Sequence, residues 1–153
     1  MAKMRDAIRM SEAGIAALVD ECKSLQVATL DPDGAPHLTT VWFAREGTAW
    51  LFETYGKSQK VVNLRRDPRV ALLIEQGSEY SELRGVSIKG HAEVIDGGAE
   101  LLRLMKLLVA RNHKGLDDNE VAVIAESMAE KRVVVAVTPD RVMSWDHRKL
   151  GLG

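Results

Sequence analysis

Hydrophobic and polar positions alternate in several short stretches of the chain, as they do in half-buried β-strands. Such stretches lie at residues 25–30, 36–44 and 49–54, and the turn sequence Asp31-Pro32-Asp33-Gly34 joins the first two. The alternation and the turns predict that the first half of the chain forms a meander of antiparallel strands. The same reasoning predicts three later strands, at residues 70–75, 86–95 and 133–137. Gly90 predicts a bulge in the strand at residues 86–95.

Apolar residues at helical spacing predict helices on both sides of these strands. Ser11 is expected to cap the first helix, whose apolar face carries Ile15, Leu18, Val19 and Cys22. Residues 100–111 carry leucines at helical spacing. Asp117 and Glu120 have the spacing of a capping box, which predicts a further helix that ends near Lys131.

The order of these elements predicts one α+β domain over residues 1–153. Six or so mostly antiparallel strands with peripheral helices are typical of a barrel-like arrangement. Its expected segments are an N-terminal helix (1–24), the barrel strands with a polar loop (25–96), helices (98–131) and a last strand with a tail (133–153).

Charge and composition exclude several classes of function. The formal net charge is -1, so no overall positive field attracts nucleic acid or an acidic membrane. The single cysteine, Cys22, excludes an intramolecular disulfide and a cysteine-rich zinc site. The chain has no apolar run of roughly 18 residues and no signal-peptide pattern at its start. We therefore expect a cytoplasmic protein with no nucleic-acid or membrane partner.

The polar turn before residue 61 is the first candidate site. Gly56 ends a strand pattern, and Lys57, Ser58, Gln59 and Lys60 follow before apolar residues resume. A turn that opens a helix offers free backbone N–H groups, which together with a hydroxyl and two ammonium groups would bind a phosphate or a similar anion. A solvated helix start explains the same residues equally well.

The remaining chemistry-bearing residues carry weaker patterns. No two histidines have a metal-ligand spacing, and the chain contains neither a nucleophile elbow nor a glycine-rich nucleotide motif. We therefore predict no metal site. Trp145 stands beside charged residues in the tail, where it would either cover an aromatic ring or another subunit, or anchor the C-terminus to the core.

Three motifs in order resemble a known family. The chain carries D-G-x-P from Asp33, S-x-K-x-x-N-L-x-x-D-P-R-V from Ser58, and G-x-A-E from Gly90. Together they resemble the pyridoxamine 5'-phosphate oxidase-like split barrels of the flavin and deazaflavin oxidoreductase superfamily. The resemblance implies a six-stranded split β-barrel that forms a homodimer, with the cofactor in a cleft between the two chains.

The resemblance also implies which residues contact the cofactor. The loop at Ser58–Lys60 would hold the phosphate, the strand at Thr39–Trp42 would lie against the ring, and residues near Arg84 would reach it from the partner chain. Trp145 would flank the ring. The full set is Thr39, Thr40, Val41, Trp42, Thr54, Lys57, Ser58, Gln59, Lys60, Arg84, Gly85 and Trp145.

Departures from the family pattern reduce the range of activities that the resemblance implies. Thr39 and Gln59 stand where pyridoxamine 5'-phosphate oxidases carry arginine, and residues 146–150 lack their arginine-histidine tail. Vitamin B6 oxidation is therefore disfavoured. The N-L-R-R-D-P-R sequence from Asn63 is similar to the branch that uses the deazaflavin coenzyme F-420.

The resulting hypothesis is an oxidoreductase that transfers a hydride between F-420 or FMN and a small conjugated organic substrate. The alternative is a binding protein that carries a flavin or haem without turnover. The cofactor would carry the chemistry, so no catalytic side chain is assigned. A proton would come from solvent or from Tyr55, Tyr80 or His147.

Overall fold

The computed structural model describes residues 3–151, and six antiparallel strands in it close into a barrel. The strand order is β1-β2-β3-β6-β5-β4, and β4 pairs with β1 to close the ring. This confirms the predicted α+β class and the six-stranded antiparallel barrel. The strands are β1 (Ser24–Leu30), β2 (Pro36–Glu46), β3 (Ala49–Tyr55), β4 (Arg69–Gln76), β5 (Arg84–Ile95) and β6 (Arg132–Asp146).

The helices begin where the sequence places their caps. The Ser11 hydroxyl accepts a hydrogen bond from the Gly14 N–H at 3.0 Å, and the Asp117–Glu120 capping box forms as predicted. The helices are α1 (Met4–Ala7), α2 (Glu12–Glu21), α3 (Gln59–Arg66), α4 (Gly98–Asn112) and α5 (Asp118–Ala129), with short 3₁₀ turns η1 (Tyr80–Glu82) and η2 (His147–Leu150). No helix within residues 3–151 is long and apolar enough to cross a membrane.

The last strand, β6, is longer than the sequence predicted. A last strand that stops at Val137 was expected, but β6 continues through Pro139 to Asp146. Beyond Val137 the pairing with β3 has ended and β6 pairs only with β5, so a proline without an N–H group is tolerated there. The register shifts at Gly90, as the predicted bulge requires, and a Cβ at Gly90 would lie 2.4 Å from the Thr138 carbonyl oxygen.

The barrel is open along part of one strand. Residues 36–42 of β2 pair with β1, whereas only residues 43–46 pair with β3. One backbone edge of β2 therefore has no strand partner over residues 36–42 in the part of the chain that the structure describes. We call this opening the β2 seam.

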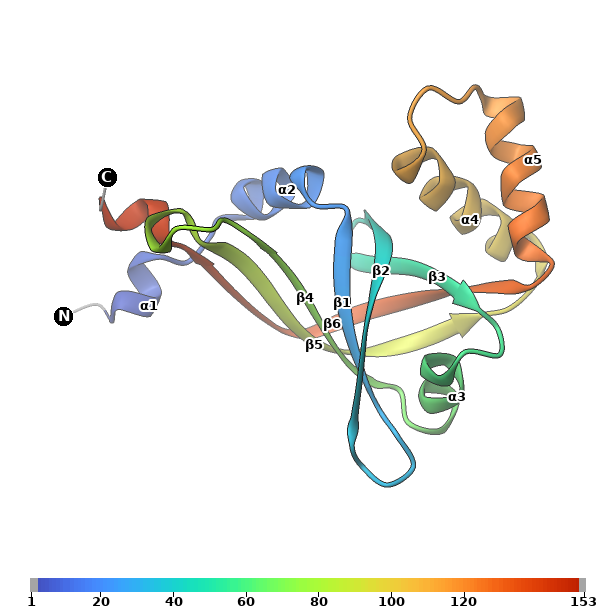
Figure 1. Ribbon diagram of the computed structural model, residues 1–153, viewed down its shortest axis with the longest axis horizontal. Coiled ribbons are helices and arrows are strands. Elements are labelled where there is room, and N and C mark those ends of the chain that lie inside the picture. Colours follow the sequence, from blue (N-terminus) through green and yellow to red (C-terminus); the bar gives the residue numbers. More distant parts are fainter. Residues whose placement is uncertain (1–2, 152–153) are drawn as a thin grey trace.

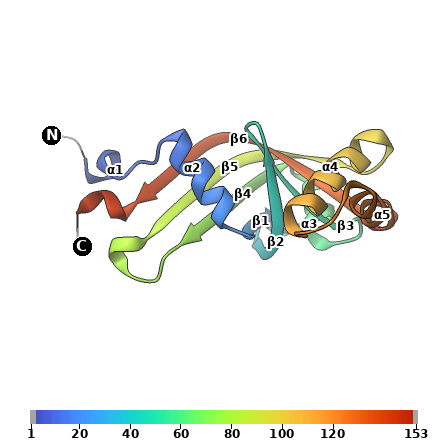
Figure 2. The same cartoon turned by 90° about the horizontal axis from the view of Figure 1, so that it is seen from above.

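The molecule is elongated, and its two ends differ (Figure 1). Strands β4, β5 and β6 extend beyond the barrel toward the end that carries α1, α2 and both termini, while α3, α4 and α5 lie at the other end. The view from above shows the same arrangement (Figure 2). We call these the terminal end and the α3 end.

Two apolar clusters hold the fold together. Inside the barrel, the rings of Phe43 and Trp50 stack at 5.8 Å and are fully buried with Phe52. Outside it, Leu51 and Val134 pack with α4 and α5. Burial on both faces explains why β3 and β6 carry nearly continuous apolar runs rather than strict alternation.

Candidate functional site

The predicted phosphate loop brings three polar side chains together at the start of α3. Lys60 Nζ donates a hydrogen bond to Thr54 Oγ1 at 3.3 Å, and Thr54 Oγ1 lies 3.3 Å from Ser58 Oγ. Thr54 comes from the end of β3, while Ser58 and Lys60 belong to the first turn of α3. We call these three residues the Lys60 cluster.

Backbone donors in the same turn lack acceptors. The N–H groups of Val61 and Val62 both donate to the Ser58 carbonyl oxygen at 3.1 Å. The N–H groups of Gln59 and Lys60 have no acceptor among residues 3–151, and the Ser58 hydroxyl does not cap them. Helix N-termini with free N–H groups bind anions, because the helix dipole adds to the hydrogen bonds.

Lys60 is a partly buried cation without an acidic partner in the described part of the chain. Burial lowers the pKa of its ammonium group, and the more distant charge of Glu53 only partly opposes that effect. Its ammonium group donates to a neutral hydroxyl oxygen. Because withdrawing a charge from water is costly without a counter-charge, an anion bound here would stabilise the site.

Asn63 anchors α3 to the end of β1, and the sequence analysis did not identify it. Its side chain is 0% exposed and donates to Thr29 Oγ1 at 3.0 Å and to Asp31 Oδ1 at 2.9 Å. It accepts from Gln59 Nε2 at 2.9 Å. This hydrogen bond directs the Gln59 side chain along α3 toward Asn63 and away from the Lys60 cluster. A polar residue between the apolar Val61 and Leu64 could have revealed this role.

The β2 seam contributes unpartnered polar atoms. Thr39 faces the barrel interior opposite Val27, and His37 lies on the same face opposite Thr29. Thr39 Oγ1 and His37 Nδ1 are both buried and have no hydrogen-bond partner within residues 3–151. Buried polar atoms normally have partners, so this pair marks a place where a ligand could supply them. His37 was not predicted as a site residue. It is two residues from Thr39 on the same strand, so strand alternation could have placed both side chains on one face.

Of the other predicted seam residues, Thr40 and Trp42 lie on the outer face and Val41 lies on the inner face. Thr40 lies on the outer face, where its hydroxyl accepts from Gln26 Nε2 at 3.3 Å. Val41 is half-buried against the barrel core. Trp42 is 47% exposed, and its ring meets the His113 ring edge-on at 5.8 Å. An exposed tryptophan beside an open strand edge is suited to contact a flat ligand.

Lys57 does not join the Lys60 cluster. Its exposed side chain lines a separate cavity of about 670 Å³ together with Gly56, Asp96 and Lys131. The structure therefore splits the two lysines of the turn between two surfaces. Sequence spacing alone could not distinguish them, because the turn reverses direction between them.

The last predicted contacts lie together at the terminal end. Gly85 pairs with Trp145, and a Cβ at Gly85 would lie 2.1 Å from Trp145 Cζ2. The indole therefore lies directly across Gly85, which explains why a glycine stands there. Arg84 forms an ion pair with Glu21 at 2.5 Å and is only 13% exposed.

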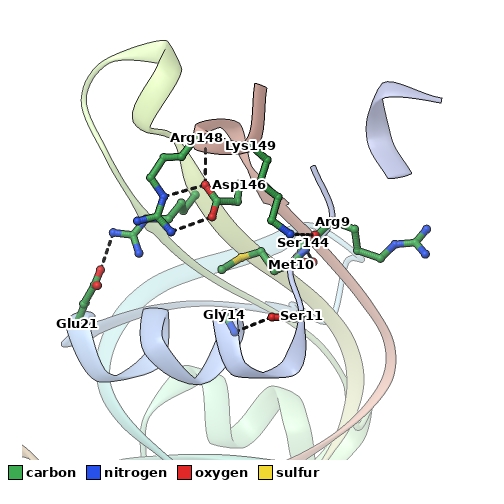
Figure 3. A network of polar contacts seen from close by, with 10 residues as sticks. Arg9, Met10, Ser11, Gly14, Glu21, Ser144, Asp146, Arg148 and Lys149 are labelled. Carbon is green, nitrogen blue, oxygen red and sulfur yellow. Dashed lines mark hydrogen bonds and ion pairs between the residues drawn. The ribbon is translucent and has the colours of Figure 1, made fainter. Parts of the chain in front are cut away.

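Ion pairs anchor this end of the chain (Figure 3). Arg148 donates to both oxygens of Asp146, at 2.9 and 2.8 Å, and these bonds lower the pKa of the Asp146 carboxyl group. The hydrogen bond from Arg84 likewise lowers the pKa of Glu21. The first pair links η2 to the last residue of β6, and the second links β5 to the end of α2.

One chain does not bring all the predicted contacts together. The Lys60 cluster and the β2 seam belong to the α3 end of the barrel, whereas Arg84, Gly85 and Trp145 belong to the terminal end (Figure 1).

The fold is a six-stranded split barrel, and the Lys60 cluster lies at the N-terminus of α3. The family model described as pyridoxamine 5'-phosphate oxidase matches residues 11–146, and the chain belongs to that family. The family includes oxidoreductases.

Known proteins resemble the chain to different degrees. A conserved hypothetical protein from Mycobacterium tuberculosis is 45% identical with a TM-score of 0.91, over 99% of this chain and 94% of that one. The curated pyridoxine/pyridoxamine 5'-phosphate oxidase of Kineococcus radiotolerans is 33% identical over 84 residues, which span 55% of this chain but only 34% of that protein. A structure described as an F420 reductase shares the fold, with a TM-score of 0.61 and 23% identity over 82% of this chain and 93% of that one.

Proposed function

We propose that this protein is an oxidoreductase that binds FMN or F-420 and transfers a hydride between that cofactor and a small conjugated organic substrate. The observation that carries the proposal is the partly buried Lys60 ammonium, which has a neutral oxygen as its partner and two free N–H groups beside it. This combination suits a phosphate group of a cofactor.

The residues at the α3 end fit such a group. Lys60, Ser58 and the N–H groups of the first turn of α3 would hold the phosphate. The open backbone edge of β2 next to Thr39 would offer donors and acceptors to the polar edge of a ring. The buried Thr39 Oγ1 and His37 Nδ1 would gain the partners that they lack within the described residues.

We further propose that the protein acts as a homodimer with the cofactor cleft between the chains. The separation of the Lys60 cluster from Trp145 within one chain supports this, since a second copy could place its terminal end beside the first copy's α3 end. The outer face near β2 also exposes a large apolar side chain, Leu38, which is 67% exposed and would be covered by a partner.

The protein's part in the reaction is binding, orientation and exclusion of water. When bound, the cofactor supplies the hydride chemistry. The Lys60 cluster would fix the phosphorylated stem, and the β2 seam would fix the ring so that one face meets the substrate. Trp145, held flat across Gly85, offers an apolar surface that would shield the ring from water.

Titration of the purified protein with FMN and with F-420, followed by fluorescence quenching, tests the proposal. We expect micromolar binding of one of them, and Lys60→Ala should weaken it by about 1.5–3 kcal/mol, because a charge-assisted hydrogen bond is lost. Lys57→Ala is the matched control, since it removes the same charge from a different surface. Binding of neither cofactor, or equal losses in the two variants, would overturn the assignment.

The pH dependence of binding provides a second test of the same site. Because the pKa of Lys60 is lowered by burial, its positive charge is lost at a lower pH than that of an exposed lysine. We therefore expect cofactor affinity to fall as the pH rises through that depressed pKa, and Lys60→Ala to remove this fall. Reduction of enones or quinones by the loaded protein would then separate an enzyme from a carrier that only holds the cofactor.

A further inference from the structure

A second hollow lies at the terminal end, between the N-terminal segment and the end of β6. Its volume is about 400 Å³, within the range of small-molecule sites. Its rim carries three arginines, Arg5, Arg9 and Arg141, and its apolar lining includes Met10 and Val142. We call it the arginine hollow, and we propose that it binds a small organic anion, a carboxylate or sulfonate with an apolar body.

The two sides of the hollow are tied to each other by hydrogen bonds. The Met10 N–H donates to Ser144 Oγ at 3.0 Å, and Figure 3 shows the two groups side by side. The Asp146 N–H donates to the Ile8 carbonyl oxygen at 2.7 Å, and Lys149 Nζ donates to the Arg9 carbonyl oxygen at 2.5 Å. These bonds fix the N-terminal segment against β6, so the hollow is formed before any ligand arrives.

The arginines carry more positive charge than the described residues neutralise. Arg9 pairs with Asp6 at 2.7 Å. The guanidinium group of Arg5 donates to the Met143 thioether sulfur at 3.3 Å, and a thioether is a weak acceptor. Neither Arg5 nor Arg141 forms an ion pair with a carboxylate within residues 3–151. Two guanidinium groups are therefore available to a carboxylate or sulfonate, whose planar or branched oxygens match their paired N–H groups.

The apolar lining distinguishes the ligand from a simple inorganic ion. Met10 and Ile15 form a buried floor, and beside them Val142 and Met143 remain 48% and 37% exposed. An apolar body would cover these side chains and gain the free energy of removing them from water, whereas inorganic phosphate would leave them exposed. An anionic head on an apolar body therefore satisfies both parts of the hollow.

This site is separate from the proposed cofactor site. The lining of the arginine hollow contains none of the residues proposed to contact the cofactor, Trp145 included, so its binding can be measured without FMN or F-420. Failure of FMN and F-420 to bind would leave it standing.

Calorimetric titration of the full chain carrying Lys60→Ala, which removes the ammonium group of the Lys60 cluster, with octanoate, inorganic phosphate and 1-octanol tests the inference. These probes supply the anion with the chain, the anion alone and the chain alone. We expect octanoate to bind at least about tenfold more tightly than either of the others. Phosphate binding as tightly as octanoate, or no octanoate binding at all, would overturn the inference.

Matched variants locate the binding. The double variant Arg5→Gln with Arg141→Gln should weaken octanoate binding by at least about tenfold, because charge-assisted hydrogen bonds are lost. Lys114→Gln removes a charge from an exposed position between α4 and α5 and should bind octanoate normally. Lys60→Ala should also bind it normally. Circular dichroism confirms that each variant is folded, and unchanged octanoate affinity in a folded double variant would refute the site.

Discussion

Buried polar groups at the two ends of the molecule differ in whether they have partners. At the α3 end, Lys60 meets only a neutral hydroxyl, and Thr39 Oγ1 and His37 Nδ1 have no partner within the described residues. At the terminal end, Arg84 and Arg148 are paired with Glu21 and Asp146. Buried polar groups therefore serve different purposes: the unpaired ones at the α3 end are suited to a ligand, and the paired ones at the terminal end anchor the chain. Arg5 and Arg141 of the arginine hollow differ from both, because they are exposed and form no ion pair with a carboxylate within residues 3–151.

The comparison of the two ends also bears on the role of Trp145. Its indole lies across Gly85 and is held by the strand register, as an anchoring residue would be. The same packing leaves it as a flat surface at the terminal end, so anchoring and shielding a ring are compatible roles. Substituting one residue at each end tests whether the packing and hydrogen bonds described there stabilise the protein.

Asn63→Ala should have the largest effect, at the α3 end. It removes a fully buried amide and leaves Thr29, Asp31 and Gln59 without their partner, so we expect a loss of about 3 kcal/mol in the free energy of unfolding. Urea unfolding measures it. Val62→Ala is the control, because Val62 is exposed on the same helix and should change stability by less than about 0.5 kcal/mol.

The cofactor affinity of Asn63→Ala tests whether Asn63 also matters for binding. If Asn63 positions the Lys60 cluster, affinity for FMN or F-420 in the folded fraction should fall as well, whereas Val62→Ala should retain it. A destabilised Asn63→Ala protein with normal cofactor affinity would show that the anion site does not depend on this scaffold.

Gly85→Ala should have the next largest effect, at the terminal end. The new Cβ would overlap the Trp145 ring, so the indole must move, at a cost of about 2 kcal/mol in stability and with a shift in tryptophan fluorescence. Gly97→Ala is the control, since its Cβ would meet nothing within 4 Å and its φ is -173°. An unchanged emission spectrum and unfolding midpoint in Gly85→Ala would contradict the close packing described above.

Asp146→Asn should have the smallest effect, about 1 kcal/mol at pH 7, because it removes a charge-assisted pair with Arg148. The folded-state pKa of Asp146 is lowered, so its contribution is present above the unfolded-state pKa of about 4 and is lost as the pH falls through the folded-state value. The difference between wild type and variant should therefore shrink below about pH 4. Urea unfolding at pH 7 and pH 3 measures it.

Glu126→Gln serves as the control for that experiment, because Glu126 is exposed on α5 and forms no ion pair within the described residues. Its stability should follow that of the wild type at both pH values. A constant difference between wild type and Asp146→Asn across the pH range would show that the ion pair is not the source of the effect.

Local patterns determined much of this protein. The Ser11 cap, the Asp117–Glu120 capping box and the bulge at Gly90 each depend on residues that are close in sequence or on one strand, so their spacing is enough to predict them. The alternating stretches likewise predicted the six strands and the α+β class, because the side-chain period of a strand is set by the backbone alone.

Tertiary structure decided the rest. The sequence could not show that β6 continues past Pro139, since only pairing with β5 keeps that segment extended. It could not show that Asn63 is bonded to Thr29 and Asp31, or that the buried His37 Nδ1 lacks a partner within the described residues. Nor could it show that Lys57 is separated from the Lys60 cluster, or that Trp145 lies at the opposite end from Lys60. The physical reason is the same in each case: contacts between distant segments depend on strand register and barrel closure, which no short stretch of sequence contains.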